Sequence, residues 1–266
     1  MIQTATTAGW QITEGPSTAK PVPESDCGIL WLVTSETDIA AAPAVDWLVI
    51  ADDPSRALAT VVAATGTATV APIAASAIWH TARRFATASS LALDGAAVLE
   101  APAEALDLPH LGLVRRSHVA AVPPITATAL NVYQTVPPAS GATAVWTRDL
   151  FTFSGDCPTG ELLPVDLTGR PRVLVYGPHV DLPAGNWRAT VRIGVDPEGR
   201  RVRLRLEWGP TANMKAASIT IRESGHYAIA LEQDWPGQAA AEVRIWLEEA
   251  SFGGRLDLLD VRVERP

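Results

Sequence analysis

The stretch DLTGRPRVLVYGPHVDLPAGNWRATVRI, Asp166–Ile193, decides the fold of the C-terminal half of the chain. It holds two apolar runs separated by a Leu-Pro-Ala-Gly turn, and the second run alternates apolar and polar residues. Pro183 fixes φ and Gly185 permits a positive φ, so this sequence suits a tight turn. Successive side chains of a strand point to opposite faces. The stretch therefore predicts a strand, a turn and a second strand that begins with Trp187 pointing inward.

Short apolar runs continue from Trp146 to the C-terminus, and the turn sequences DPEG, ESG, WPG and FGG interrupt them. Many short strands at this spacing predict an antiparallel β-sandwich of the jelly-roll kind. The predicted strands are Val145–Phe153, Glu161–Leu167, Arg172–Tyr176, Asn186–Val195, Arg201–Trp208, Ser218–Arg222, His226–Leu231, Glu242–Glu248 and Leu256–Val263.

The alternation also predicts what each face of these strands carries. Trp187 and Trp208 fall on apolar faces and are expected in the core. The opposite faces are rich in arginine, and we expect some of those side chains to lie together on one solvent-exposed sheet. These candidate ligand-binding residues are Arg188, Arg192, Arg203, Arg205, Arg244 and Trp246.

The N-terminal half has a different pattern, in which apolar strands alternate with helical segments. Asp53 and Pro54 suit the N-cap and first position of a helix, and Gly66 suits its end. Buried strands that alternate with helices predict a small α/β domain. The expected division is an extended arm over 1–26, an α/β domain over 27–120, a Pro-rich connection over 121–144 and the jelly roll over 145–266.

Composition narrows the class of protein. The formal net charge of −8 argues against a general nucleic-acid binder, which usually has a basic excess. No apolar run approaches the ~20 residues that a membrane-spanning helix needs. The N-terminus lacks the basic and apolar regions of a signal peptide. We therefore expect a cytoplasmic protein, or one that reaches a particle or surface assembly without a cleaved signal, with Cys27 and Cys157 as free thiols.

The opening stretch resembles a jelly-roll domain found beside glycosyltransferases and other surface-glycan proteins of alphaproteobacteria. The resemblance lies in Thr168–Arg192, with weaker support from GHYAIAL and GGRLDLLDVRVER, and it covers the C-terminal half only. Such domains are similar to carbohydrate-binding modules, which implies a fold that binds a glycan without catalysis. This sequence departs from the pattern at His179, where the family has an aromatic residue, usually tyrosine.

Other candidate residues come from single features. Trp235 lies in a predicted turn, and the loop-end residues Tyr176 and His179 could also face a sugar. Asp257 and Asp260 could hold a structural calcium, or they could be exposed strand charges. Asp52 with Asp53 resembles the acidic turn of a nucleotide-sugar enzyme, whereas the simpler interpretation is the helix cap described above.

These observations predict non-catalytic binding of a carbohydrate. Arginines that meet carboxylates would favour an acidic surface or capsular polysaccharide, and tryptophan rings would stack on sugar faces. No nucleophile, phosphate-loop or metal motif is present in the sequence, so we expect no enzyme and no cofactor beyond that calcium. Two alternatives stay open: a homo-oligomeric spike or adhesion component with the jelly roll as its receptor-binding head, and a glycan-processing enzyme with its site in the N-terminal domain.

Overall fold

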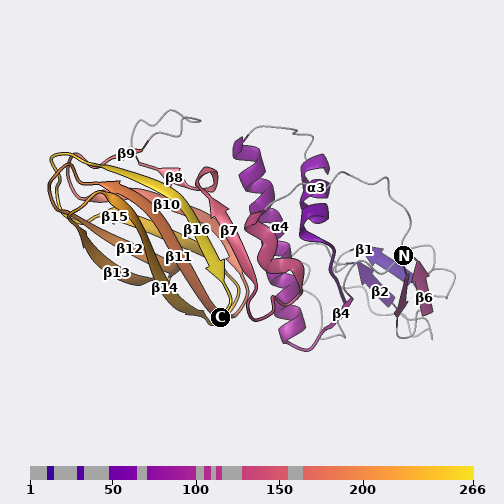
Figure 1. The fold of residues 1–266 in the computed structure, drawn as a ribbon. Coiled ribbons are helices and arrows are strands. Elements are labelled where there is room, and N and C mark those ends of the chain that lie inside the picture. Colours follow the sequence, from indigo (N-terminus) through magenta and orange to yellow (C-terminus); the bar gives the residue numbers. More distant parts are fainter. Residues whose placement is uncertain are drawn as a thin grey trace.

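The C-terminal half is a sandwich of two antiparallel sheets (Figure 1). One sheet has the strand order β13-β12-β15-β10-β8, and the other has the order β14-β11-β16-β7 with β9 paired to β16. The strands are β7 (Thr143–Thr147), β8 (Thr152–Phe153), β9 (Val165–Asp166), β10 (Arg172–Leu182), β11 (Gly185–Asp196), β12 (Val202–Pro210), β13 (Lys215–Ile221), β14 (Gly225–Trp235), β15 (Ala239–Leu247) and β16 (Arg255–Glu264). The predicted fold class is confirmed.

The computed structural model describes most of the chain. The described residues are 11–14, 29–32, 48–64, 71–99, 105–108, 112–115, 128–154 and 164–266. Among them, the N-terminal half contains two α-helices, α3 (Pro54–Ala64) and α4 (Ala71–Leu93), and three pairs of short strands. The parallel pairs are β1 (Gln11–Glu14) with β2 (Ile29–Leu32) and β3 (Leu48–Ile50) with β4 (Ala97–Leu99), and the antiparallel pair is β5 (Ala105–Leu108) with β6 (Gly112–Arg115).

Apolar side chains from both sheets fill the sandwich. Trp187 and Trp208 are fully buried, as their place in the alternation predicts. The ring of Trp208 lies 5.8 Å from that of Trp146 and 5.0 Å from that of Trp235, measured between centroids. The Trp208 indole donates a hydrogen bond of 3.3 Å to the Trp187 carbonyl, so the buried N–H has a partner.

The segment predicted as one strand over 145–153 is not a single strand. It is β7, a short 3₁₀ turn over Arg148–Leu150 (η2), and β8. Strand β7 pairs with β16 and β8 pairs with β10, so the chain crosses here from one sheet to the other. A chain that passes from one sheet to the other needs a bend, and the turn provides this change of direction.

Residues 128–134 form a 3₁₀ helix, η1 (Thr128–Gln134), inside the segment expected to be an extended Pro-rich connection. The side chains of Leu130 and Tyr133 are buried, and the Trp146 indole donates a hydrogen bond to the carbonyl of Ala129. This segment therefore contributes side chains to the core beside β7. The domain boundaries drawn from the sequence stay predictions.

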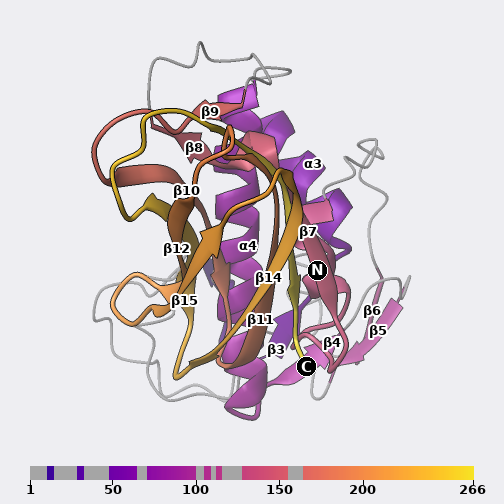
Figure 2. The same cartoon turned by 60° about the vertical axis from the view of Figure 1, so that its left-hand side comes forward.

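Helix α4 lies against one edge of the sandwich (Figures 1 and 2). The ring of Phe85 stacks on that of Tyr133 at 5.4 Å, and the Tyr133 hydroxyl donates a hydrogen bond to the carbonyl of Asp181. Thr87 donates a hydrogen bond of 3.0 Å to the side chain of Gln238. The α4 surface is thus joined to the sheet that contains β10. Among the described helices, none combines the length and apolarity needed to cross a membrane.

Candidate functional site

The candidate site is built on the outer face of the sheet β13-β12-β15-β10-β8. Tyr176 on β10 lies directly opposite Arg244 on β15, and Arg244 lies opposite Glu207 on β12. Directly opposed residues have Cβ atoms about 4.5–5.5 Å apart, so these three side chains form a row across the sheet. We call this surface the β10 face and define it by Tyr176, His179, Arg205, Glu207, Glu242, Arg244 and Trp246.

An acid–arginine pair occupies the middle of the β10 face. Both Glu242 oxygens accept hydrogen bonds from Arg244, at 2.9 Å from Nε and 2.8 Å from Nη2. Glu242 is only 3% exposed and also accepts a longer hydrogen bond, 3.3 Å, from the Thr211 hydroxyl. Its hydrogen bonds to Arg244 raise the pKa of the guanidinium above its ordinary value. A bidentate pair of this kind holds its donors and acceptors in a fixed geometry.

Trp246 is held by polar neighbours on the same face. Its indole donates a hydrogen bond of 2.8 Å to Glu207, and the Arg205 guanidinium lies 5.0 Å from the ring centroid. The Arg205 Nε atom is 3.1 Å from Glu207, without the angle of a hydrogen bond. Arg205 therefore covers one side of the Trp246 ring, which leaves less of that ring for a ligand than the sequence suggests.

Three aromatic rings lie together where β10 meets α4. The ring of His179 is 6.4 Å from that of Tyr176 and 6.5 Å from that of Trp79 on the helix. Tyr176 and Trp79 are each 38% exposed. Aromatic rings with one accessible side can stack on the CH groups of a sugar. Trp79 was missed by the sequence analysis because only the folded chain brings α4 beside β10.

His179 has an unusual backbone conformation, with a φ of 62°. It lies at a bulge, because Pro178 pairs with Glu242 and Val180 pairs with the next residue, Ala241. A bulge redirects the side chain of its extra residue, and bulges are frequent next to binding sites. Here the bulge leaves the His179 side chain exposed between the rings of Tyr176 and Trp79.

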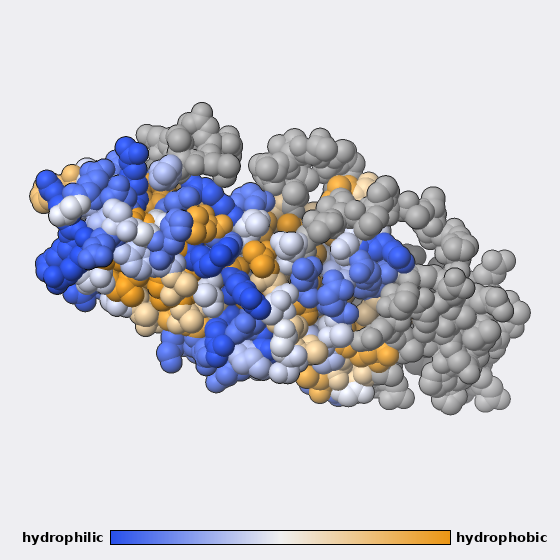
Figure 3. Space-filling model, viewed as in Figure 1, coloured by the Kyte–Doolittle hydropathy of each residue, from blue (hydrophilic) through white to orange (hydrophobic). Residues whose placement is uncertain are grey.

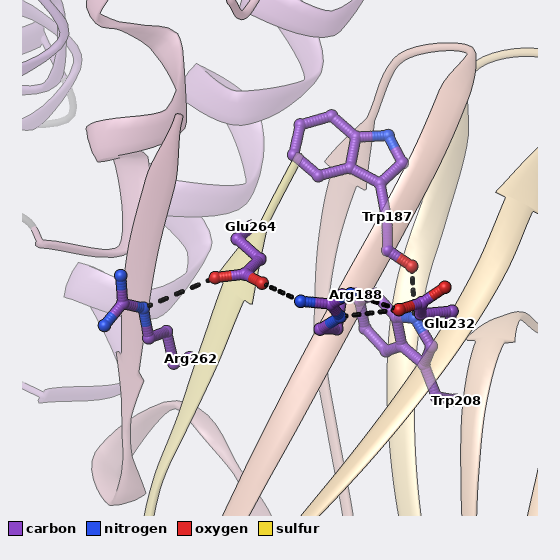
Figure 4. A network of polar contacts seen from close by, with 6 residues as sticks. All are labelled: Trp187, Arg188, Trp208, Glu232, Arg262 and Glu264. Carbon is purple, nitrogen blue, oxygen red and sulfur yellow. Dashed lines mark hydrogen bonds and ion pairs between the residues drawn. The ribbon is translucent and has the colours of Figure 1, made fainter. Parts of the chain in front are cut away.

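The candidate arginines, only some of which were predicted to lie together, are divided between the two sheets. Arg188 and Arg192 lie on β11, in the sheet opposite the β10 face. Arg188 bonds both Glu232 and Glu264, and Figure 4 shows this row of charges continuing to Arg262. Arg192 forms a bidentate pair with Asp260. Hydrogen bonds to these carboxylates raise the pKa of both arginines.

Arg203 lies on β12 in the sheet of the β10 face, farther along it from Arg244. Its Nε atom donates a hydrogen bond of 2.8 Å to Glu248, and Glu249 is a second ion-pair partner at 3.5 Å. The predicted binding arginines therefore all have carboxylate partners within the chain. On the face of the sandwich that Figure 3 shows, the surface is mostly hydrophilic, with smaller hydrophobic areas between.

Two further sets of candidate residues remain. Trp235 was expected at the surface, but it is 2% exposed, because β14 extends to this residue and packs its ring on Trp208. Asp257 and Asp260, which could hold calcium or be exposed strand charges, are ion-paired to Arg148 and Arg192. In the described part of the chain, no three His, Cys, Asp or Glu side chains are grouped to hold a metal ion.

In the N-terminal half, Asp53 caps α3. Its carboxylate accepts hydrogen bonds from the amides of Ser55 at 2.9 Å and Arg56 at 3.1 Å, as an N-cap does. Asp52 accepts the amide of Asp53 at 2.8 Å. The simpler interpretation of this acidic pair, a helix cap, accounts for the geometry. Cys27 and Cys157 lie outside the described residues.

Comparisons with solved structures find carbohydrate-binding modules, each aligned with about half of this chain. One is the CBM36-1 domain of a multidomain xylanase from the hindgut metagenome of Trinervitermes trinervoides, at 13% identity over 47% of this chain and 98% of that one, with a TM-score of 0.33. Another is the CBM22-1 xylan-binding domain from Paenibacillus barcinonensis, at 9% identity over 48% and 98%, with a TM-score of 0.32.

A third is a CBM61 domain in complex with β-1,4-galactotriose, at 15% identity over 47% of this chain and 88% of that one, with a TM-score of 0.28. At these identities and TM-scores the likenesses assign neither a family nor a ligand to this chain. No family model and no curated protein matches the sequence.

Proposed function

We propose that the β-sandwich binds a carbohydrate, without catalysis, on the β10 face. The observation that carries this proposal is the row of Tyr176, Arg244 and Glu207 across three strands, with the His179 ring beside it. A sugar offers hydroxyl groups around its rim and CH groups on its faces. Carboxylate acceptors and guanidinium donors suit the first, and an exposed ring suits the second.

The ion pairs of this face bear on the kind of carbohydrate. Arg244 is bound by Glu242, and Arg205 lies beside Glu207. An acidic polymer, which the sequence suggests, would have to compete with these internal carboxylates. Hydroxyl groups can instead use the hydrogen-bonding positions that each pair leaves free. The pairs therefore favour an uncharged glycan as the ligand.

A glycan array with the full chain tests this function, followed by titration of the best ligand into variants. We expect Tyr176→Ala to weaken binding by about twofold to tenfold, from the loss of one stacking ring. Phe252→Ala is the matched control, because Phe252 is 82% exposed in the loop after β15 and outside the β10 face. Equal affinity of the two variants, both folded, would place the ligand elsewhere.

Salt dependence separates the two classes of glycan. An uncharged ligand should bind with nearly the same affinity at low and high ionic strength, because few charges cross the interface. An acidic polymer held by arginines should lose affinity steeply as salt rises. A steep loss would restore the acidic polysaccharide that the sequence predicts.

A further inference from the structure

We infer that Trp79 of helix α4 is a subsite for a second part of the glycan, so that the ligand is a chain which crosses from the sheet to the helix. This inference rests on the proposed function of the β10 face. It concerns a residue of the N-terminal half, outside the sandwich.

The first support is the position of the ring. Trp79 lies beside His179, and His179 lies beside Tyr176, with centroid separations of 6.5 Å and 6.4 Å. The interplanar angles are 73° and 58°, so the three rings are inclined to one another. We call these three rings the aromatic wall. A chain of several sugars could contact the rings in turn.

The second support is that polar contacts hold helix α4 against β10, close to these three rings. Arg83, one turn after Trp79, forms an ion pair of 4.0 Å with Asp181 on β10. Gln238 donates hydrogen bonds to the Asp181 carboxylate at 3.3 Å and to the Arg83 carbonyl at 3.4 Å. These contacts lie two residues from His179 along β10. A binding surface shared by two elements needs a constant spacing between them. The ion pair and the hydrogen bonds hold α4 against β10 at this point.

The third support is the exposed surface of Trp79. Its neighbours Ala77, Ile78 and Ala82 provide the buried side of α4, whereas Trp79 is 38% exposed. The exposed part of its ring lies beside the exposed ring of His179. Its accessible surface is free to meet a ligand.

The experiment measures affinity against chain length. Neutral oligosaccharides from disaccharide to hexasaccharide, taken from the chain type that binds best on the array, are titrated into the full protein. We expect affinity to rise with length until the chain reaches Trp79. In Trp79→Ala the last part of that rise, about twofold to tenfold, should vanish, while short oligosaccharides bind as they do to the unchanged protein.

Leu93→Ala is the matched control, because Leu93 is an exposed apolar residue at the other end of α4. Trp79→Phe should restore part of the rise. If Trp79→Ala binds long and short chains like the unchanged protein, or loses affinity equally for both, the subsite does not exist and the β10 face still binds sugar. If no neutral chain on the array binds, the proposed function fails first.

Discussion

His179 holds a backbone conformation that most residues avoid. A left-handed φ costs an L-residue roughly 1–2 kcal/mol, whereas glycine adopts it freely. The side chain is exposed and lies between two other aromatic rings. A residue with a strained backbone and an exposed side chain is better explained by the contacts of that side chain than by packing of the core.

We predict that His179→Gly weakens glycan binding severalfold without lowering stability. Relief of the left-handed conformation offsets the added flexibility of glycine in the unfolded chain, so the free energy of unfolding should stay equal or rise by up to about 1 kcal/mol. The matched control is Glu198→Gly, since Glu198 also has a positive φ, 51°, in the turn between β11 and β12. Urea unfolding and glycan titration of both variants check this prediction. A His179→Gly protein with unchanged affinity would remove His179 from the site.

At the scale of elements, η1 shows that a segment outside the strands is part of the sandwich core. Leu130 is fully buried, and Tyr133 reaches from η1 to both α4 and β10. Four residues of this element are buried, Ala129, Leu130, Val132 and Tyr133, and the contacts of Tyr133 connect the helix to the sheet. The Pro-rich composition around it predicts an interruption of regular strands and says nothing about burial.

We predict that Leu130→Ala lowers the free energy of unfolding by about 2–5 kcal/mol, the usual cost of emptying a buried leucine site. Asn131→Ala, at the exposed neighbouring position of the same element, should change it by no more than about 0.5 kcal/mol. Equilibrium unfolding in urea measures both values. Equal effects of the two substitutions would show that η1 does not belong to the cooperative core.

At the scale of the whole molecule, several carboxylates link stability to pH. A hydrogen bond from the Thr168 amide lowers the pKa of Asp166, one from the Ser224 hydroxyl lowers that of Asp196, and one from Ser218 lowers that of Glu248. A lowered pKa in the folded state means that the stabilising contribution is present above the unfolded pKa of about 4. It is lost as the pH falls through the folded value.

Tyr133 links stability to pH in the alkaline range. Burial, helped by the nearby Asp181, raises its pKa well above 10. A raised pKa keeps the phenol neutral at pH values where the unfolded chain ionises it, so its contribution is complete below about 10 and is lost as the pH rises through the folded value. The two effects together give a broad range of constant stability between the acid and alkaline limits.

We therefore predict that the free energy of unfolding is constant near neutrality, falls below about pH 4 and falls again above about pH 10. Asp196→Asn should flatten part of the acid fall, and Tyr133→Phe should flatten the alkaline one. Urea unfolding at a series of pH values measures both slopes. An acid fall as steep in Asp196→Asn as in the unchanged protein would contradict the contribution of that carboxylate.

Local patterns in the sequence predict most strands of the sandwich and the buried side of those strands, although the segment 145–153 and Trp235 depart from the prediction. Trp187 and Trp208 are in the core because alternation with a period of two follows from backbone geometry alone. The cap at Asp53 was predictable for a similar reason, since it depends on residues within one turn.

The fold of the whole chain sets which strands share a sheet. It placed Arg188 and Arg244 on opposite sides of the sandwich and gave each a carboxylate partner. It also brought Trp79 to His179, about a hundred positions later in the sequence. Alternation assigns a side chain to a face of its own strand, whereas strand pairing and helix docking join distant residues through contacts that leave no local periodic signal.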